Sequence, residues 1–175
     1  IFDVVYHAVK LALAQPGTGE RLFTFDADEK PENEKTIDLE APRIYGLNQY
    51  HKHLPEIKKV CGLEKDVFLN PIVCDYYRGM AVSLNVEMDY EKIYLVLKDW
   101  YRDSTLIQVE KTDLGMISAN TMAGLDCMKL IVSGNSKMCT ITSLFDNLGK
   151  GACGAAIQNM NIMLGFEEVE GLNIE

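Results

Sequence analysis

The chain has 175 residues, of which 47% are hydrophobic and 25% are charged, and it carries a formal net charge of −9. This composition excludes a disordered or collagen-like chain and predicts one globular domain, since a chain of this size buries roughly two thirds of its unfolded surface in a single core. The sequence has no Lys/Arg cluster, so we do not expect nucleic acid as a partner. No apolar run approaches the roughly 20 residues that cross a bilayer, so we do not expect a membrane protein.

The first 40 residues divide into a predicted helix and an acidic loop. Val5, Ala8, Val9 and Ala12 recur at helical spacing and predict a helix over residues 2–14, which Pro16 and Gly17 would end. Residues 26–40 contain seven acidic residues and two lysines, more than half of the net negative charge. Few apolar residues fall in register there, so we interpret residues 26–40 as a solvent-exposed loop.

Four elements are predicted between residues 45 and 102. A short helix opens at Pro55 and ends at Gly62. A strand over residues 67–73 contains Pro71, which requires an edge or strand-end position. A second strand over residues 82–88 alternates apolar and polar side chains. Asp89 then caps a helix that runs to about residue 102, and we expect its Trp and Tyr stripe to lie in the core.

The C-terminal third predicts three strands and a final helix. The strands cover residues 106–110, 128–133 and 138–145, and the last two are joined by a hairpin turn at residues 134–137. The final helix places Ala152, Ala155, Ala156, Met160 and Met163 on one side and ends at Gly165. Strands with a few covering helices indicate an α+β domain.

The five cysteines are Cys61, Cys74, Cys127, Cys139 and Cys153, an odd number without a C-x-x-C pair. The chain also begins without a recognisable signal peptide, so we expect a cytoplasmic protein with reduced, mostly buried thiols. Cys153 has the most favourable position for a nucleophile, near a predicted helix start, but its Gly and Ala neighbours favour packing instead.

Residues 149–154 (GKGACG) match the dinucleotide pattern G-x-G-x-x-G. That pattern needs a further strand with an acidic residue about 20 positions on, and the sequence ends at Glu175 without one. A self-contained Rossmann site is therefore not expected. The remaining interpretations are close helix packing and a backbone that receives an anion.

His51, His53 and Glu56 lie together at the start of the predicted short helix. They could bind zinc, but further ligands are missing at a suitable spacing. They could also form a surface pair without a function. The third interpretation is acid–base chemistry, because the positive end of a helix dipole favours a neutral imidazole that can accept a proton.

Three segments resemble the short-chain type of N-acetyl-gamma-glutamyl-phosphate reductase. They are YGLNQYHKHLPEIKKVCGL (45–63), NPIVCDYYRGMAVSLNV (70–86) and FDNLGKGACGAAIQNMNIMLGF (145–166). The resemblance implies a C-terminal lobe like that of glyceraldehyde-phosphate dehydrogenase, with a mixed, largely antiparallel sheet and helices packed on one face. Residues 1–175 would form this single domain, without the Rossmann lobe that binds NADP and carries the catalytic cysteine.

The resemblance also implies roles for individual residues. His53 would be the catalytic acid–base, and His51, Glu56 and Arg78 would bind substrate. Asn147, Gly149 and Gly151 would approach the NADP cofactor, and no metal is expected. The implied reaction is the NADPH-dependent reduction of N-acetylglutamyl 5-phosphate to the semialdehyde in arginine biosynthesis.

Three alternatives remain open at this point. The chain could belong to a reductase of a carrier-linked aminoadipyl phosphate or to an aspartate-semialdehyde dehydrogenase, although the HKHLPE motif disfavours the latter. It could also be an assembly module that kept the fold and lost the chemistry. In each case we expect a homo-oligomer, with the polar sheet face of Ser83, Asn85 and Glu87 as the candidate contact.

Overall fold

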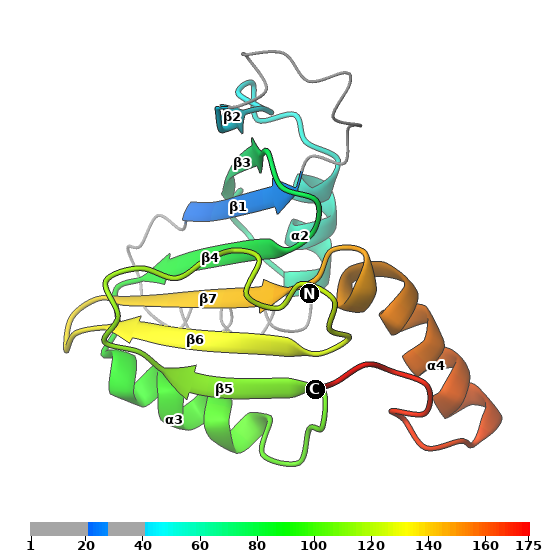
Figure 1. The fold of residues 1–175 in the computed structure, drawn as a ribbon. Helices are drawn as coiled ribbons and strands as arrows, with labels where there is room; N and C mark the ends of the chain where they lie inside the picture. The colour runs from blue at the N-terminus through cyan, green and yellow to red at the C-terminus, as the bar shows by residue number, and fades with distance from the viewer. Residues whose placement is uncertain (1–20, 28–40) are drawn as a thin grey trace.

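The computed structural model describes residues 21–27 and 41–175 (Figure 1). The predicted helix at residues 2–14 and most of the acidic segment lie outside the described residues. Residues 26 and 27 belong to strand β1 (Arg21–Ala27), which the sequence analysis did not predict. The interpretation of residues 26–40 as a loop is therefore wrong at its start, because backbone pairing with strand β3 extends to residues 26 and 27.

The described residues form one seven-stranded sheet in the order β2-β3-β1-β4-β7-β6-β5 (Figure 1). The other strands are β2 (Arg43–Ile44), β3 (Phe68–Cys74), β4 (Met80–Val86), β5 (Ile107–Lys111), β6 (Met128–Gly134) and β7 (Cys139–Phe145). The pairs β1–β3 and β5–β6 are parallel, and the remaining pairs are antiparallel. The prediction of a mixed, largely antiparallel sheet is confirmed.

Helices α2 (His53–Cys61) and α3 (Tyr90–Trp100) cover the same face of this sheet. Their buried residues Ile57, Cys61, Ile93 and Leu97 join one core cluster with the apolar side chains of β4, β6 and β7. A second, smaller cluster on the other face is covered by residues 119–125 and by the C-terminal residues 169–174. The α+β architecture with helices on one face is therefore as expected.

The helix ends follow the predicted capping residues. Gly62, with φ 62°, ends α2 in the left-handed conformation, and the Asp89 side chain accepts the Glu91 N–H at 2.9 Å to cap α3. Helix α2 begins two residues before Pro55. Trp100 is 60% exposed, so its predicted place in the core is wrong: the buried face of α3 is formed by Ile93 and Leu97.

Pro71 lies in the middle of β3 rather than at its end. Strand β3 is next to the edge of the sheet, and the two residues of β2 pair only with Val73 and Ile72. Most of the outer side of β3 therefore has no neighbouring strand. A proline is tolerated on such a side because its missing N–H removes no hydrogen bond between strands.

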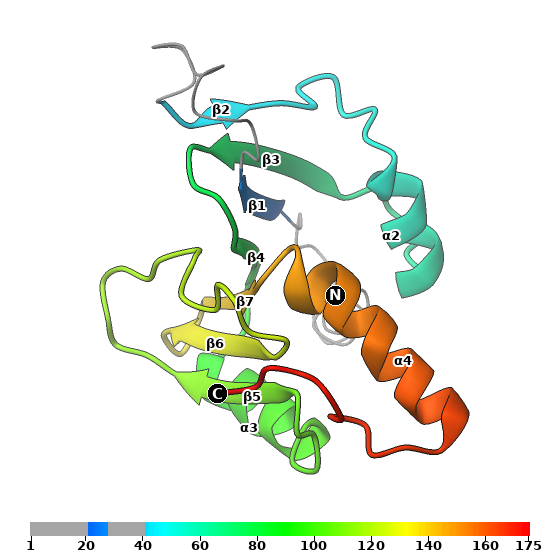
Figure 2. The same ribbon diagram turned by 45° about the vertical axis from the view of Figure 1, so that its right-hand side comes forward.

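The last helical segment extends beyond the end of β7 (Figure 2). It consists of a π-helical turn, η3 (Gly149–Cys153), and helix α4 (Gly154–Leu164), which Gly165 ends with φ 75°. Only Gly154 and Asn161 of α4 are buried, whereas Met163 is 84% exposed. None of the helices in the described part of the chain is long and apolar enough to span a membrane.

Candidate functional site

The two predicted histidines lie together at the start of α2. The His53 backbone N–H donates to His51 Nδ1 at 3.3 Å, and the two ring centroids are 4.8 Å apart. The Tyr45 ring lies 5.8 Å from the His51 ring. Because Nδ1 accepts a hydrogen bond, His51 is held with that nitrogen unprotonated, and the exposed His53 ring is the one presented to solvent.

Electrostatics also favour a neutral His51. Burial lowers the pKa of His51, and the neighbouring His53 and Lys52 lower it further, against the opposite effect of Glu56. Glu56 in the first turn of α2 therefore acts on His51 through its charge. The predicted group of His51, His53 and Glu56 is thus brought together in space.

Gln49 fixes the loop that carries this histidine pair. Its side-chain Nε2 donates to the Leu69 carbonyl at 3.0 Å, and its Oε1 accepts the Leu69 N–H at 3.1 Å. The side chain therefore continues the hydrogen bonding of β3 where the short β2 stops. Gln49 has a φ of 58°, a left-handed conformation that costs a non-glycine residue free energy.

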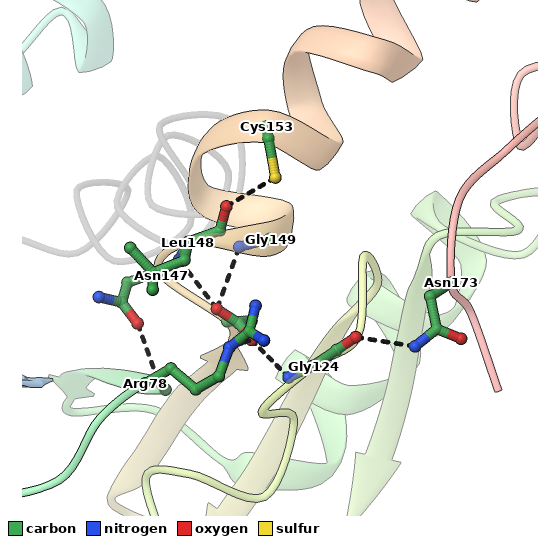
Figure 3. Close-up of polar contacts among 9 residues, drawn as sticks. Arg78, Gly124, Asn147, Leu148, Gly149, Cys153 and Asn173 are labelled. Carbon is green, nitrogen blue, oxygen red and sulfur yellow. Dashed lines mark hydrogen bonds and ion pairs between the residues drawn. The ribbon is translucent and has the colours of Figure 1, made fainter.

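A second group of predicted residues surrounds Asp146, directly after β7 (Figure 3). The Asp146 side chain is fully buried. Its Oδ1 accepts the N–H groups of Leu148 at 2.8 Å and Gly149 at 3.0 Å. Its Oδ2 accepts the Gly124 N–H and forms an ion pair with Arg78 Nε at 2.6 Å. One carboxylate therefore contacts three segments: the connection between β3 and β4, the loop before β6, and the start of the helical turn η3.

The neighbouring residues form a second, parallel link. Asn147 Oδ1 accepts the Gly79 N–H at 2.8 Å, next to the Arg78–Asp146 ion pair. Gly79 has a φ of 118°, and a Cβ there would lie 2.6 Å from the Asn120 Cα, so only glycine fits. We call these two contacts, Arg78–Asp146 and Gly79–Asn147, the double clasp.

The donors around Asp146 keep its carboxylate ionised. Burial by itself raises the pKa of a carboxyl group, but the donors from Gly124, Gly149, Leu148 and Arg78 together bring the pKa of Asp146 below its usual value. A buried carboxylate with this many donors is a fixed negative charge. It is ion-paired with Arg78, whose side chain is still 34% exposed and whose guanidinium has further N–H groups that suit a carboxylate or phosphate.

The glycines of the G-x-G-x-x-G pattern are explained by packing. A Cβ on Gly149 would lie 2.9 Å from both Asp126 Oδ1 and the Leu125 carbonyl oxygen. A Cβ on Gly151 would lie 3.1 Å from the Asp146 carbonyl oxygen, and one on Gly154 would overlap the Asp126 carboxylate. The start of the helix therefore packs closely against the half-buried residues 125 and 126 and against the Asp146 backbone, which favours the close-packing interpretation. A role of Gly149 and Gly151 at a cofactor stays a prediction.

Sequence reasoning missed Asp146 and Gln49. Asp146 follows the last apolar strand directly, which is a recognisable signal for an acidic residue at a sheet end, whereas nothing in the sequence points to the Gln49 contact across 20 residues.

Within the described residues, no group of three or more His, Cys, Asp and Glu side chains has a geometry that could hold a metal ion. Cys153 is exposed, and its thiol lies 2.9 Å from the Leu148 carbonyl oxygen.

Residues 27–147 match the family model described as semialdehyde dehydrogenase, dimerisation domain. The chain belongs to this family. The fold agrees: aspartate semialdehyde dehydrogenase II from Vibrio cholerae superposes with a TM-score of 0.61 at 15% identity, over 93% of this chain and 59% of that one.

Curated relatives of this chain include several proteins named N-acetyl-gamma-glutamyl-phosphate reductase. The protein of that name from Sinorhizobium medicae is 38% identical over 148 residues, which is 76% of this chain and 48% of the relative. The one from Rhizobium meliloti is 34% identical over 163 residues, 85% of this chain and 51% of the relative. The chain therefore spans about half the length of the curated relatives that it matches.

Proposed function

We propose that this chain is the C-terminal lobe of an N-acetyl-gamma-glutamyl-phosphate reductase. The observation that carries the proposal is the double clasp, because it brings two of the motif segments quoted above, residues 70–86 and 145–166, into contact at one site. The shared name of the curated relatives supports the same substrate, N-acetylglutamyl 5-phosphate, reduced to its semialdehyde.

In this proposal His53 is the catalytic acid–base. Its exposed imidazole lies at the first residue of α2, where a partner sulfur and substrate can reach it. His51 and Glu56 support the ring and contact substrate. Arg78 binds the anionic end of the substrate, because its side chain is partly exposed and a planar guanidinium suits a carboxylate or phosphate.

The cofactor of this reaction is NADP, which supplies the hydride when bound. The residues present fit one side of such a site: Gly151 is exposed and lacks a side chain, so a ligand can approach the backbone of η3. Asn147 has its carboxamide orientation fixed by the Gly79 N–H. We assign most of the cofactor binding, and the nucleophilic cysteine, to a Rossmann lobe on another stretch of polypeptide.

The function is tested by complementation. The expressed chain is assayed for NADPH oxidation with N-acetylglutamyl phosphate, alone and mixed with the N-terminal half of a curated relative. We expect turnover only in the mixture. Turnover by the chain alone would disprove the assigned division of labour, and an inactive mixture of folded halves would disprove the proposed reaction for this chain.

The role of His53 is tested in the same mixture. His53→Ala should lower turnover by about 100-fold or more, the usual scale for a general acid–base. Lys59→Ala, at an exposed position of the same helix, is the matched control and should leave turnover unchanged. An unchanged rate in His53→Ala would remove His53 from the mechanism.

We also propose that the chain assembles with a second copy through the polar face of the sheet. Membership of a dimerisation-domain family supports assembly. On this face Ser83 Oγ lies 2.9 Å from Thr142 Oγ1, and Thr140 Oγ1 donates to Asn85 Oδ1 at 2.7 Å, so a row of hydroxyl and amide groups crosses β4 and β7. A monomeric mass by light scattering would count against this assembly.

A further inference from the structure

We propose that Asp146 is a positioning residue that fixes Arg78 in the orientation in which its guanidinium receives the substrate anion. The anion part of this inference rests on the proposed function, whereas the fixing of Arg78 by Asp146 stands on the geometry alone. Asp146 has no assigned role in the proposed chemistry and does not itself face solvent.

The first argument is the kind of acceptor that this position requires. Both oxygens of Asp146 are engaged: Oδ1 accepts the Leu148 and Gly149 N–H groups, and Oδ2 accepts the Gly124 N–H and forms the ion pair with Arg78 Nε. A carboxylate satisfies all of them because it is an acceptor only. An asparagine would place an NH2 group against at least one buried donor, so a neutral substitute of the same size cannot reproduce the arrangement.

The second argument is the geometry at Arg78. Asp146 contacts Nε rather than the end of the guanidinium, at 2.6 Å. This ion pair holds the buried Nε atom of the guanidinium against a fixed carboxylate, while the Arg78 side chain as a whole stays 34% exposed. The Arg78 Cζ lies 5.9 Å from the Tyr77 ring centroid, which limits the group from a second side.

The third argument is that the backbone is fixed at the same place. The Gly79–Asn147 contact, one residue along from the ion pair in both segments, prevents the β3–β4 connection from shifting as a unit. The Arg78 side chain and the Gly79 backbone are therefore both held by the Asp146–Asn147 pair. Figure 3 shows Arg78 and Asn147 next to each other in this group. Such double fixation is what a binding group needs, since a misplaced cation loses most of its directional hydrogen bonding.

The experiment measures the order of Arg78 directly. In the 15N-labelled chain, the solvent exchange of the Arg78 Nε–Hε group is followed by NMR, with Arg102 as the internal reference. Arg102 is an exposed arginine that also contacts carboxylates, Asp99 and Asp103. We expect the Arg78 Hε to exchange at least about 10-fold more slowly than that of Arg102, because Arg78 Nε is buried and ion-paired with Asp146, whereas the Arg102 side chain is exposed. Equal exchange rates in the wild type would overturn the proposal.

Two variants then test whether it is the Asp146 carboxylate that holds the Arg78 side chain in place. Asp146→Asn should abolish the slow exchange of the Arg78 Hε, and Asp99→Asn, at the surface arginine pair, should not affect it. If Asp146→Asn is folded and the Arg78 exchange stays slow, the proposal is wrong. If Asp146→Asn does not fold, Arg78→Lys decides, because it keeps the positive charge but cannot donate from the Nε position.

Anion binding gives the functional readout. Inorganic phosphate and N-acetylglutamate are titrated into each protein, and their affinities are read from the shifts of the Arg78 Nε and Gly79 amide resonances. We expect Asp146→Asn, or Arg78→Lys read at Gly79, to weaken binding about 10-fold. Unchanged affinity would overturn the positioning role. If the wild type binds neither probe, the role of Arg78 in the proposed function fails, while the exchange measurement still decides whether Asp146 fixes Arg78.

Discussion

Replacing Gln49 with alanine should destabilise the domain through a contact that only the folded chain contains. The Gln49 side chain forms two hydrogen bonds with the Leu69 backbone, at 3.0 and 3.1 Å, on the open side of β3. At roughly 0.5–1.5 kcal/mol for each bond, their loss lowers the free energy of unfolding by about 2 kcal/mol. For a domain of this size that corresponds to a decrease in Tm of about 4–8 °C.

A second substitution at the same position measures the free-energy cost of the left-handed backbone conformation separately. Gln49→Gly loses the same two bonds but relieves the left-handed backbone conformation, with its φ of 58°. It should therefore be less destabilising than Gln49→Ala, by about 1 kcal/mol. Urea unfolding monitored by circular dichroism measures both values.

Asn48→Ala is the control for this pair of variants. Asn48 is exposed and its side chain accepts only the Tyr50 N–H, at 3.2 Å, so its loss should change stability by less than about 0.5 kcal/mol. If Gln49→Ala is no more destabilising than Asn48→Ala, the Gln49 side chain does not hold the loop, and the reasoning about the histidine pair loses its support.

Three further predictions concern packing and ionisation. Gly154→Ala should lower the free energy of unfolding by about 1–3 kcal/mol because its Cβ would overlap the half-buried Asp126 carboxylate, while Gly115→Ala, with open space around it, should be neutral in the same urea titration. Burial raises the pKa of Cys139 to about 12 from 9.0. The contribution of this thiol to the free energy of unfolding should therefore be fully present below pH 9 and be lost as the pH rises toward 12. A Cys139→Ala variant with the same alkaline decrease would contradict this. His51 has a lowered pKa, so its contribution to stability is present above pH 6.5 and lost as the pH falls through its folded value. Imidazole NMR should show its midpoint below 6.5 and moving upward in Lys52→Ala; a midpoint that does not move would exclude the charge effect.

Local sequence patterns predicted most of the elements from residue 53 onward. Strand alternation in residues 82–86 and the capping residues Gly62, Asp89 and Gly165 correspond to β4 and to the ends of α2, α3 and α4. These features depend on side-chain periodicity and on backbone conformations that a few residue types favour, so a short window of sequence contains them. Strand β1 was missed because its backbone pairs with β3 and β4, which are distant in sequence.

In the candidate site, too, contacts between residues close in the sequence were predictable and contacts between distant residues were not. The histidine pair was predictable because its members are two positions apart at a helix start, where local geometry alone brings them together. The Arg78–Asp146 pair was not, since its members are separated by 68 positions and meet only because β4 and β7 are neighbours in the sheet. The resemblance to a known family pointed to Arg78 but gave no reason for its orientation.

The sequence by itself determined the local elements, the cap residues and the presence of two histidines on one short turn, because these follow from interactions within a few residues. The tertiary structure alone decided which buried carboxylate orients Arg78, why Gly149 and Gly154 must lack side chains, and why Trp100 lies outside the core. Those outcomes depend on the order of strands in the sheet, which is set by the free energy of burying many side chains together rather than by any single segment.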